Sequence, residues 1–239
     1  MPFSMKGVMV KVTGKGFHRL RERLSDPLLT GLTIMLAVFM FVIAPIQAAG
    51  VLAAHQFGLA FALVLIAAVF IVSGSLAAVA AILVAVALII VATVTRLRHP
   101  SVVDIYLDAS SWLITGLALG FVVARAVFAP GVVTFHRIMG AVLLYLNIAL
   151  IFMALFCFVA LLEPNAFAGI KPLQDDLVVA SNLIYFSFVT LTSVGYGDIV
   201  PLHPYARSLA NVEAIIGQLY PATLLARLVT LELESRRSR

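Results

Sequence analysis

The stretch Thr190-Leu-Thr-Ser-Val-Gly-Tyr-Gly-Asp198 carries glycine at two alternate positions, 195 and 197. Glycine enters positive-φ conformations that a side chain penalises. Alternating glycines therefore allow successive carbonyl groups to turn in one direction. Stacked rings of such carbonyls can replace the water around a small cation. The stretch thus predicts a backbone that binds cations.

This stretch resembles the selectivity filter of the tetrameric potassium channels, with Ser193 standing where that family usually has threonine. The family has a short pore helix before the filter, and residues 177–192 have the length and composition for it. After the filter come a short exposed turn, here Asp198 to Pro204, and a long inner helix, here Tyr205 to about Leu231. The resemblance covers roughly residues 133–235 and indicates a bacterial six-span channel with a single pore domain.

The composition places the chain in a membrane. Of its residues 63% are hydrophobic and 11% are charged, whereas charged residues make up about a quarter of a soluble domain. The formal net charge of +5 lies mainly at the two ends, which favours a cytoplasmic face beside anionic lipid over nucleic-acid binding. No metal-ligand spacing, Ser/His pairing or phosphate loop indicates an enzyme. We expect no cofactor other than potassium ions in the filter.

Apolar runs long enough to cross a bilayer divide the chain into six expected spans. They are residues 28–49, 57–72, 76–95, 112–128, 133–162 and 205–231, with a loop from Arg96 to Ser111 between the third and fourth. The expected fold is an all-α integral membrane protein of six transmembrane helices, with a re-entrant pore helix and a filter loop. One chain carries one filter, so the pore requires a C4 homotetramer.

Four segments follow from these spans. They are a basic cytoplasmic segment (1–26), a four-helix sensor-like membrane domain without the charge array (27–131), the pore domain (132–235) and a cytoplasmic tail (236–239). Because the filter opens outward in the family, four spans before the pore keep the basic N-terminus inside. We expect a multi-pass protein of the plasma or bacterial inner membrane with both termini in the cytoplasm.

The resemblance assigns ion binding to residues 193–197, called the filter loop below. The ligands are the carbonyls of Ser193, Val194, Gly195 and Tyr196, with the Ser193 hydroxyl at the inner end and Gly197 completing the loop. Serine keeps the hydroxyl oxygen but loses the methyl group that restricts χ1. We therefore expect potassium selectivity to be retained and the innermost site to be less ordered.

Five residues are expected to support the filter loop: Tyr185, Phe186, Thr190, Thr192 and Asp198. The Tyr196 ring is predicted to pack on Tyr185 and Phe186, where many relatives carry two tryptophans; ordinary helix packing of these aromatics is the alternative. Some family members pair the post-filter aspartate with a pore-helix glutamate, but this chain has Val189 there. Asp198 therefore requires another partner, with Tyr185 as a candidate, or stays solvated.

The inner helix supplies the candidates for gating and for the cavity wall: Glu213, Gly217, Gln218, Pro221 and Leu225. A charge within a span is costly and is a functional hypothesis by default. We expect Glu213 to bond Thr190 or Thr192 and to couple the inner helix to the filter, with a structural role as the alternative.

Gly217 and Pro221 both weaken a helix, which suits a bend below the filter, although a static kink is equally compatible with them. Gln218 and Leu225 are placed on the cavity wall by the resemblance alone.

A voltage sensor needs arginines at every third position of its fourth span, and this chain has one there, Arg125. The sequence therefore predicts a passive potassium channel that is not strongly voltage-gated, with lipids, K+ and its own copies as partners. The first four spans are expected to serve packing, lipid sensing or a partner. Two alternatives are a potassium transporter subunit and a modulatory, non-conducting channel subunit.

Overall fold

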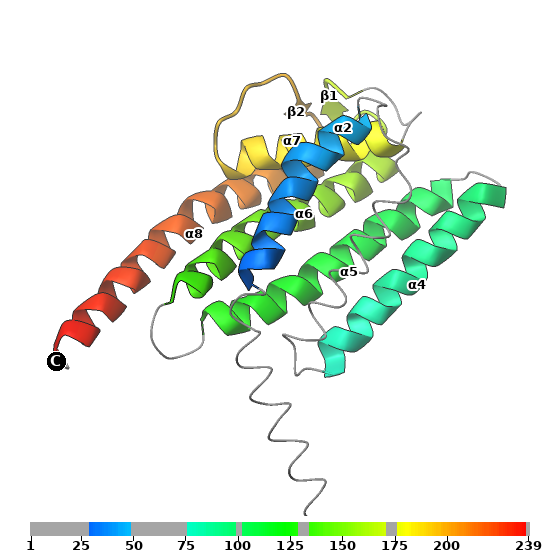
Figure 1. Cartoon of the computed structure of the whole chain (residues 1–239). Coiled ribbons are helices and arrows are strands. Elements are labelled where there is room, and N and C mark those ends of the chain that lie inside the picture. Colours follow the sequence, from blue (N-terminus) through cyan, green and yellow to red (C-terminus); the bar gives the residue numbers. More distant parts are fainter. Residues whose placement is uncertain (1–28, 49–75, 99–101, 129–133, 171–175, 238–239) are drawn as a thin grey trace, which may run out of the picture.

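The computed structural model describes residues 29–48, 76–98, 102–128, 134–170 and 176–237 (Figure 1). Residues 29–38 are helical, followed by the π-helix η1 (Phe39–Ile43), α2 (Ala44–Ala48), α4 (Leu76–Arg98), α5 (Val102–Val127), α6 (Phe135–Leu162), β1 (Phe167–Ala168), α7 (Asp176–Leu191), β2 (Val200–Pro201) and α8 (Pro204–Arg237). The all-α membrane class is confirmed, with one two-residue strand pair added to it. The basic segment 1–26 and the expected span 57–72 lie outside the described residues.

Four of the described helices are long and apolar enough to cross a membrane. They are Leu29–Ile46, Ala77–Thr95, Val103–Val127 and Phe135–Leu162. Three of them match the expected spans closely. The fourth of the expected spans was predicted to begin at residue 112, and that boundary is wrong.

The helix α5 begins ten residues earlier than predicted, because polar side chains at its start have partners inside the fold. Asp104, which is 1% exposed, accepts a hydrogen bond from the Thr95 hydroxyl of α4, and an acidic residue in a first turn also suits the helix dipole. The hydroxyls of Ser110 and Ser111 donate to carbonyls of the preceding turn, at 2.7 Å each. Residues 102–111, which were predicted to belong to a loop, are therefore helix.

The helix of residues 29–48 contains a local widening, η1, which ends two residues before Pro45. Pro45 has no N–H to donate to the carbonyl four residues earlier, so the α-helical ladder is interrupted there. The turn before it takes the wider π geometry, a common response to such an interruption.

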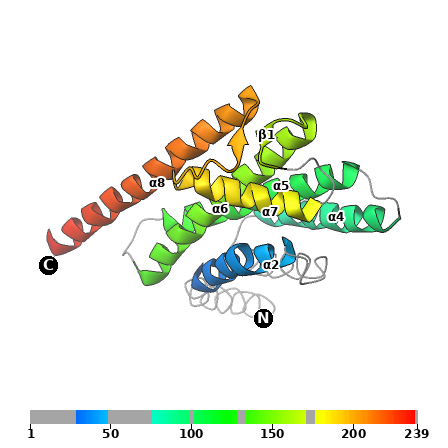
Figure 2. The same cartoon turned by 90° about the horizontal axis from the view of Figure 1, so that it is seen from above.

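Close helix contacts at small residues hold the bundle together. The helices α4, α5 and α6 lie side by side (Figures 1 and 2). At Gly116 and Gly120 of α5, an added Cβ would meet Ile151 at 2.8 Å and Asn147 at 3.0 Å on α6. The buried Asn147 amide donates to the Gly116 carbonyl at 2.8 Å. Small residues that bring backbones together are typical of membrane helix packing.

The helix of residues 29–48 packs on α6 and α7. The Thr33 hydroxyl lies 2.9 Å from the Met139 carbonyl of α6, and Thr30 hydrogen-bonds His136 at 2.9 Å. Nearer its other end, the ring of Phe41 lies 5.0 Å from that of Phe188 on α7. This helix is thereby linked to the elements that carry the filter loop.

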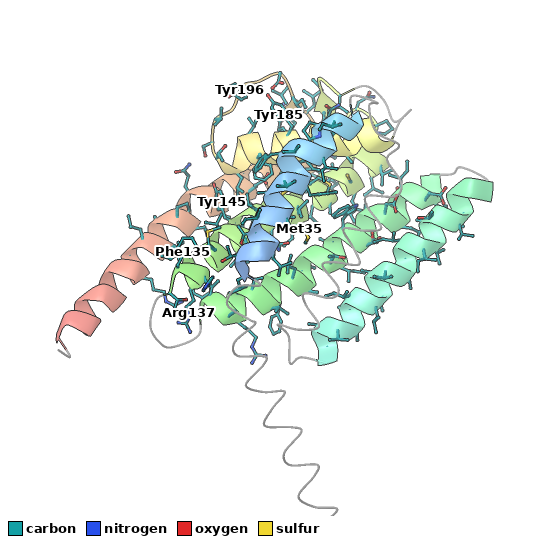
Figure 3. All side chains as sticks on the ribbon, viewed as in Figure 1. Met35, Phe135, Arg137, Tyr145, Tyr185 and Tyr196 are labelled. Atoms are coloured by element: carbon teal, nitrogen blue, oxygen red, sulfur yellow. The ribbon has the colours of Figure 1, made fainter. Side chains whose placement is uncertain are left out.

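The filter loop lies at one end of the molecule. There α7 sits between the end of α6 and the start of α8, and the strands β1 and β2 lie beside it (Figure 1). Tyr185 and Tyr196 mark this end, whereas Phe135 and Arg137 lie at the opposite end of α6 (Figure 3). The Thr134 side chain caps α6 by accepting from the Arg137 amide at 3.3 Å.

Candidate functional site

The backbone of the filter loop alternates in handedness. Ser193, Gly195 and Gly197 have φ of 58°, 60° and 80°, and Ser193 is the one non-glycine residue with positive φ among the described residues. Positive φ at every second residue reverses the peptide orientation that an extended chain would have. This is the backbone that the glycine alternation predicts.

The amide groups of the loop turn back toward α7. The N–H groups of Ser193 and Val194 donate to the carbonyls of Thr190 and Val189, at 2.9 Å each, and the Gly195 N–H also lies 3.4 Å from the Val189 carbonyl. Within the described part of the chain, no hydrogen bond uses a carbonyl of residues 193–197. Three of the five amides of the loop are therefore bonded to α7 while its carbonyls are available, as a cation site requires.

The helices α6 and α8 both contact the end of α7. The Leu191 carbonyl accepts a hydrogen bond from the Tyr145 hydroxyl of α6 at 3.3 Å. From α8, Gly217 approaches the same carbonyl so closely that an added Cβ would lie 1.8 Å from its oxygen. Tyr220 stacks on Tyr145 with ring centres 5.7 Å apart. The base of the filter is thus set by contacts to both α6 and α8.

Glu213 contacts the pore helix, but at a residue that was not predicted. Its carboxylate accepts from the Ser187 hydroxyl, which also lies 2.8 Å from the Ala149 carbonyl of α6. Both side chains are fully buried, and the second carboxylate oxygen has no partner among the described residues. The expected partner of Glu213 is therefore corrected to Ser187, one turn before Thr190. The face that α8 presents to α7 brings Glu213 to that turn. The Thr192 hydroxyl donates instead to the Phe188 carbonyl at 2.6 Å.

The expected aromatic support is present at Tyr185 only. The Tyr185 and Tyr196 rings are parallel, with centres 6.4 Å apart and planes within 1°. The Tyr185 hydroxyl also interacts electrostatically with Asp198, the candidate partner named from the sequence. Phe186 does not reach Tyr196; its buried ring packs on Phe156 at 5.0 Å and on Phe167 at 5.4 Å. Adjacent residues of a helix point about 100° apart, so the two rings face different neighbours.

The outer mouth of the loop is held by a strand pair that the sequence did not reveal. β1 and β2 pair antiparallel, with Phe167 opposite Pro201. The Ala166 carbonyl accepts from the amides of Leu202 at 2.7 Å and His203 at 3.2 Å. Gly169, at φ +86°, allows the Asp198 carbonyl to pass within 2.0 Å of the position of a Cβ. The signal available in the sequence was Gly169, which lies before the pore helix and directly after the segment that forms β1.

The inner side of the site is formed by the exposed face of α8. Gln218 Nε2 donates to the Ser193 hydroxyl oxygen at 2.8 Å. Leu225, 64% exposed, lies farther along the same helix. Pro221 lies within α8, four residues after Gly217, so the Gly217 carbonyl receives no helical hydrogen bond from it.

One residue that sequence reasoning missed joins α8 to the sensor-like helices. The Arg227 guanidinium donates to the Phe128 carbonyl at 2.9 Å and lies 4.8 Å from the centre of its ring. Phe128 directly follows α5, so a cation binds at the negative end of that helix. The lone Arg125 of α5 is exposed and lies 5.7 Å from the Phe121 ring.

Comparison with protein families assigns the region that carries this geometry. The family described as "Ion channel" matches residues 148–233, which run from the middle of α6 through the filter loop to near the end of α8. Residues 148–233 are therefore similar to an ion channel domain.

Two curated proteins share parts of the chain. Protein LctB of Bacillus caldotenax is 39% identical over 56 residues, which are 23% of this chain and 41% of that protein. Protein LctB of Geobacillus stearothermophilus is 36% identical over 67 residues, 28% of this chain and 46% of that protein. The chain thus spans less than half the length of these relatives. No solved structure matches the chain significantly.

The four apolar helices indicate a membrane protein, and residues 148–233 are similar to an ion channel domain. Among the described residues, no group of three or more histidine, cysteine or acidic side chains is arranged to hold a metal ion.

Proposed function

We propose that the protein is a potassium-selective channel in which four copies of the filter loop surround one pore. The observation that supports this most directly is the positive φ at Ser193, Gly195 and Gly197, inside a domain of the ion-channel family. The amides of Ser193, Val194 and Gly195 are bonded to α7, and the carbonyls of the loop are available to replace the water around K+. The proposed channel requires no cofactor other than the potassium ions in the filter.

Four copies are needed because one filter loop is a quarter of a ring. The residues of the loop are exposed in the single chain, with Tyr196 at 72% and Val194 at 52%. A closed C4 ring brings four such loops around one axis. The proposed location is the plasma or bacterial inner membrane with both termini in the cytoplasm, and membrane lipids are the other partners.

Conduction is proposed to be passive and weakly dependent on voltage. Arg125 is the single arginine between residues 112 and 128, so little charge is available to move through the membrane field. Glu213 is proposed to couple the inner helix to the filter, because its carboxylate joins α8 to α7 through Ser187.

The test is the reversal potential of the purified protein in a planar bilayer with potassium on one side and sodium on the other. We expect a reversal far from zero, toward the potassium potential. Current that reverses near zero would contradict potassium selectivity. Silence of the purified protein together with current when another channel subunit is added would favour the modulatory subunit.

A further inference from the structure

Ser193 occupies a position that leaves its side chain without local restraint. It lies beyond the end of α7 at positive φ. Its neighbour Thr192 holds its hydroxyl by donating to the Phe188 carbonyl one turn earlier. Ser193 also lacks the methyl group that limits threonine to few χ1 rotamers. Another group must therefore orient the Ser193 hydroxyl if it is to act as an ion ligand.

Gln218 provides that orientation from a different helix. Its Nε2 donates to Ser193 Oγ at 2.8 Å, across 25 residues of sequence. The preceding residue, Gly217, packs against the Leu191 carbonyl, so the register of α8 against the filter base is set directly beside Gln218. A hydroxyl oxygen has two lone pairs. It can accept from the amide with one and face a cation with the other.

We propose that Gln218 is the positioning residue for the innermost cation ligand of the filter. Its amide hydrogen bond restrains the orientation of the Ser193 hydroxyl, as the methyl group restrains that of threonine in the usual filter sequence. The ligand is a dehydrated monovalent cation, and the inference rests on the proposed potassium channel function. The pairing makes Ser193 and Gln218 a functional unit in this chain.

A double-mutant cycle tests the pairing without requiring an open pore. The measurement is the rise in thermal unfolding midpoint of the purified full-length protein as K+ is added, from which an apparent K+ affinity follows. The variants are Gln218→Met, which keeps an unbranched chain and removes the donor, and Ser193→Ala and Ser193→Thr, each alone and combined with Gln218→Met. Leu219→Met, at an exposed neighbouring position of α8, is the matched control.

We expect Gln218→Met to weaken the apparent K+ affinity about fivefold, the scale of one neutral hydrogen bond. In the Ser193→Ala and Ser193→Thr backgrounds the same change should have an effect of less than about twofold, because the partner is absent or restrained by its methyl group. Leu219→Met should leave the affinity unchanged.

Two results would overturn the pairing: no effect of Gln218→Met in the parent chain, or an equal effect in the Ser193→Ala background. If Gln218→Met does not fold, Gln218→Asn replaces it, since its amide is one methylene too short to reach Ser193. A parent chain stabilised equally by K+ and Na+ would instead refute the proposed function, which separates the two failures.

Discussion

Replacement of Gly217 by alanine tests whether this glycine serves a close contact or a hinge. The added Cβ would lie 1.8 Å from the Leu191 carbonyl oxygen and 2.7 Å from its carbon. Contacts of a real Cβ do not fall below 3.0 Å. The helices α7 and α8 would therefore have to separate by at least about 1.2 Å, the difference between this limit and the 1.8 Å contact. Both groups belong to helix backbones, and neither can move aside as a flexible side chain would.

The cost follows from this overlap. Overpacking of a tight site typically costs about 1–3 kcal/mol, and a clash between two backbones belongs at the upper end. Movement of Leu191 would also disturb its hydrogen bond to Tyr145, which adds about 1 kcal/mol. We therefore expect a loss of at least about 3 kcal/mol, which lowers the unfolding midpoint of a chain of this size by roughly 6–12 °C.

The assay is thermal unfolding of the purified protein in detergent, with Gly31→Ala as the matched control. Gly31 is also helical, but nothing lies within 4 Å of its added Cβ. Alanine there should be neutral or stabilising by up to about 1 kcal/mol. A Gly217→Ala protein that unfolds within about 2 °C of the parent would refute the close-contact reasoning. If its opening were altered as well, the hinge hypothesis would be favoured.

Two other substitutions test contacts that support the filter loop, one beside Tyr196 and one between α8 and α7. Tyr185→Phe keeps the ring parallel to that of Tyr196 but removes the hydroxyl that interacts with Asp198. We expect a lower K+/Na+ permeability ratio in reversal-potential measurements, because the filter loop loses a polar interaction at one end. An unaltered ratio would count against the role of Tyr185. Glu213→Gln keeps the size of the side chain but replaces one carboxyl oxygen by an amide nitrogen and so alters its bond with Ser187. A change on the scale of one hydrogen bond, about 1 kcal/mol, should shift the open probability of single channels about fivefold. An unchanged open probability would indicate a purely structural role.

Local pattern was sufficient for much of the fold. Apolar runs of bilayer length placed the spans that end at residues 95, 128 and 162 close to where the helices α4, α5 and α6 end. The pattern failed at the start of α5, where Asp104 and Asp108 interrupt the apolar run. A hydropathy pattern counts every carboxylate as an exposed group. It could not reveal that Asp104 has a hydroxyl partner on the preceding helix.

Residue type and spacing also determined the filter loop. Glycine at 195 and 197 permits positive φ irrespective of what surrounds the loop, so its alternation could be inferred from the sequence. The pore helix was likewise predicted to within a residue, at 177–192 against Asp176–Leu191. Both are properties of a few consecutive residues.

Only the tertiary structure decided which side chains support the loop. Tyr185 faces Tyr196 whereas Phe186 faces α6, Glu213 meets Ser187, and Gln218 reaches Ser193. These pairs depend on how each helix is rotated about its axis and on how far it slides along its neighbour, which many distributed contacts fix together. The sequence by itself determined that a loop with positive φ at its glycines lies in a bundle of membrane helices. The packing of α6, α7 and α8 decided which residues hold that loop in place, because the hydrogen-bonded partners Gln218 and Ser193, Glu213 and Ser187, and Tyr145 and Leu191 lie 25 or more residues apart along the chain.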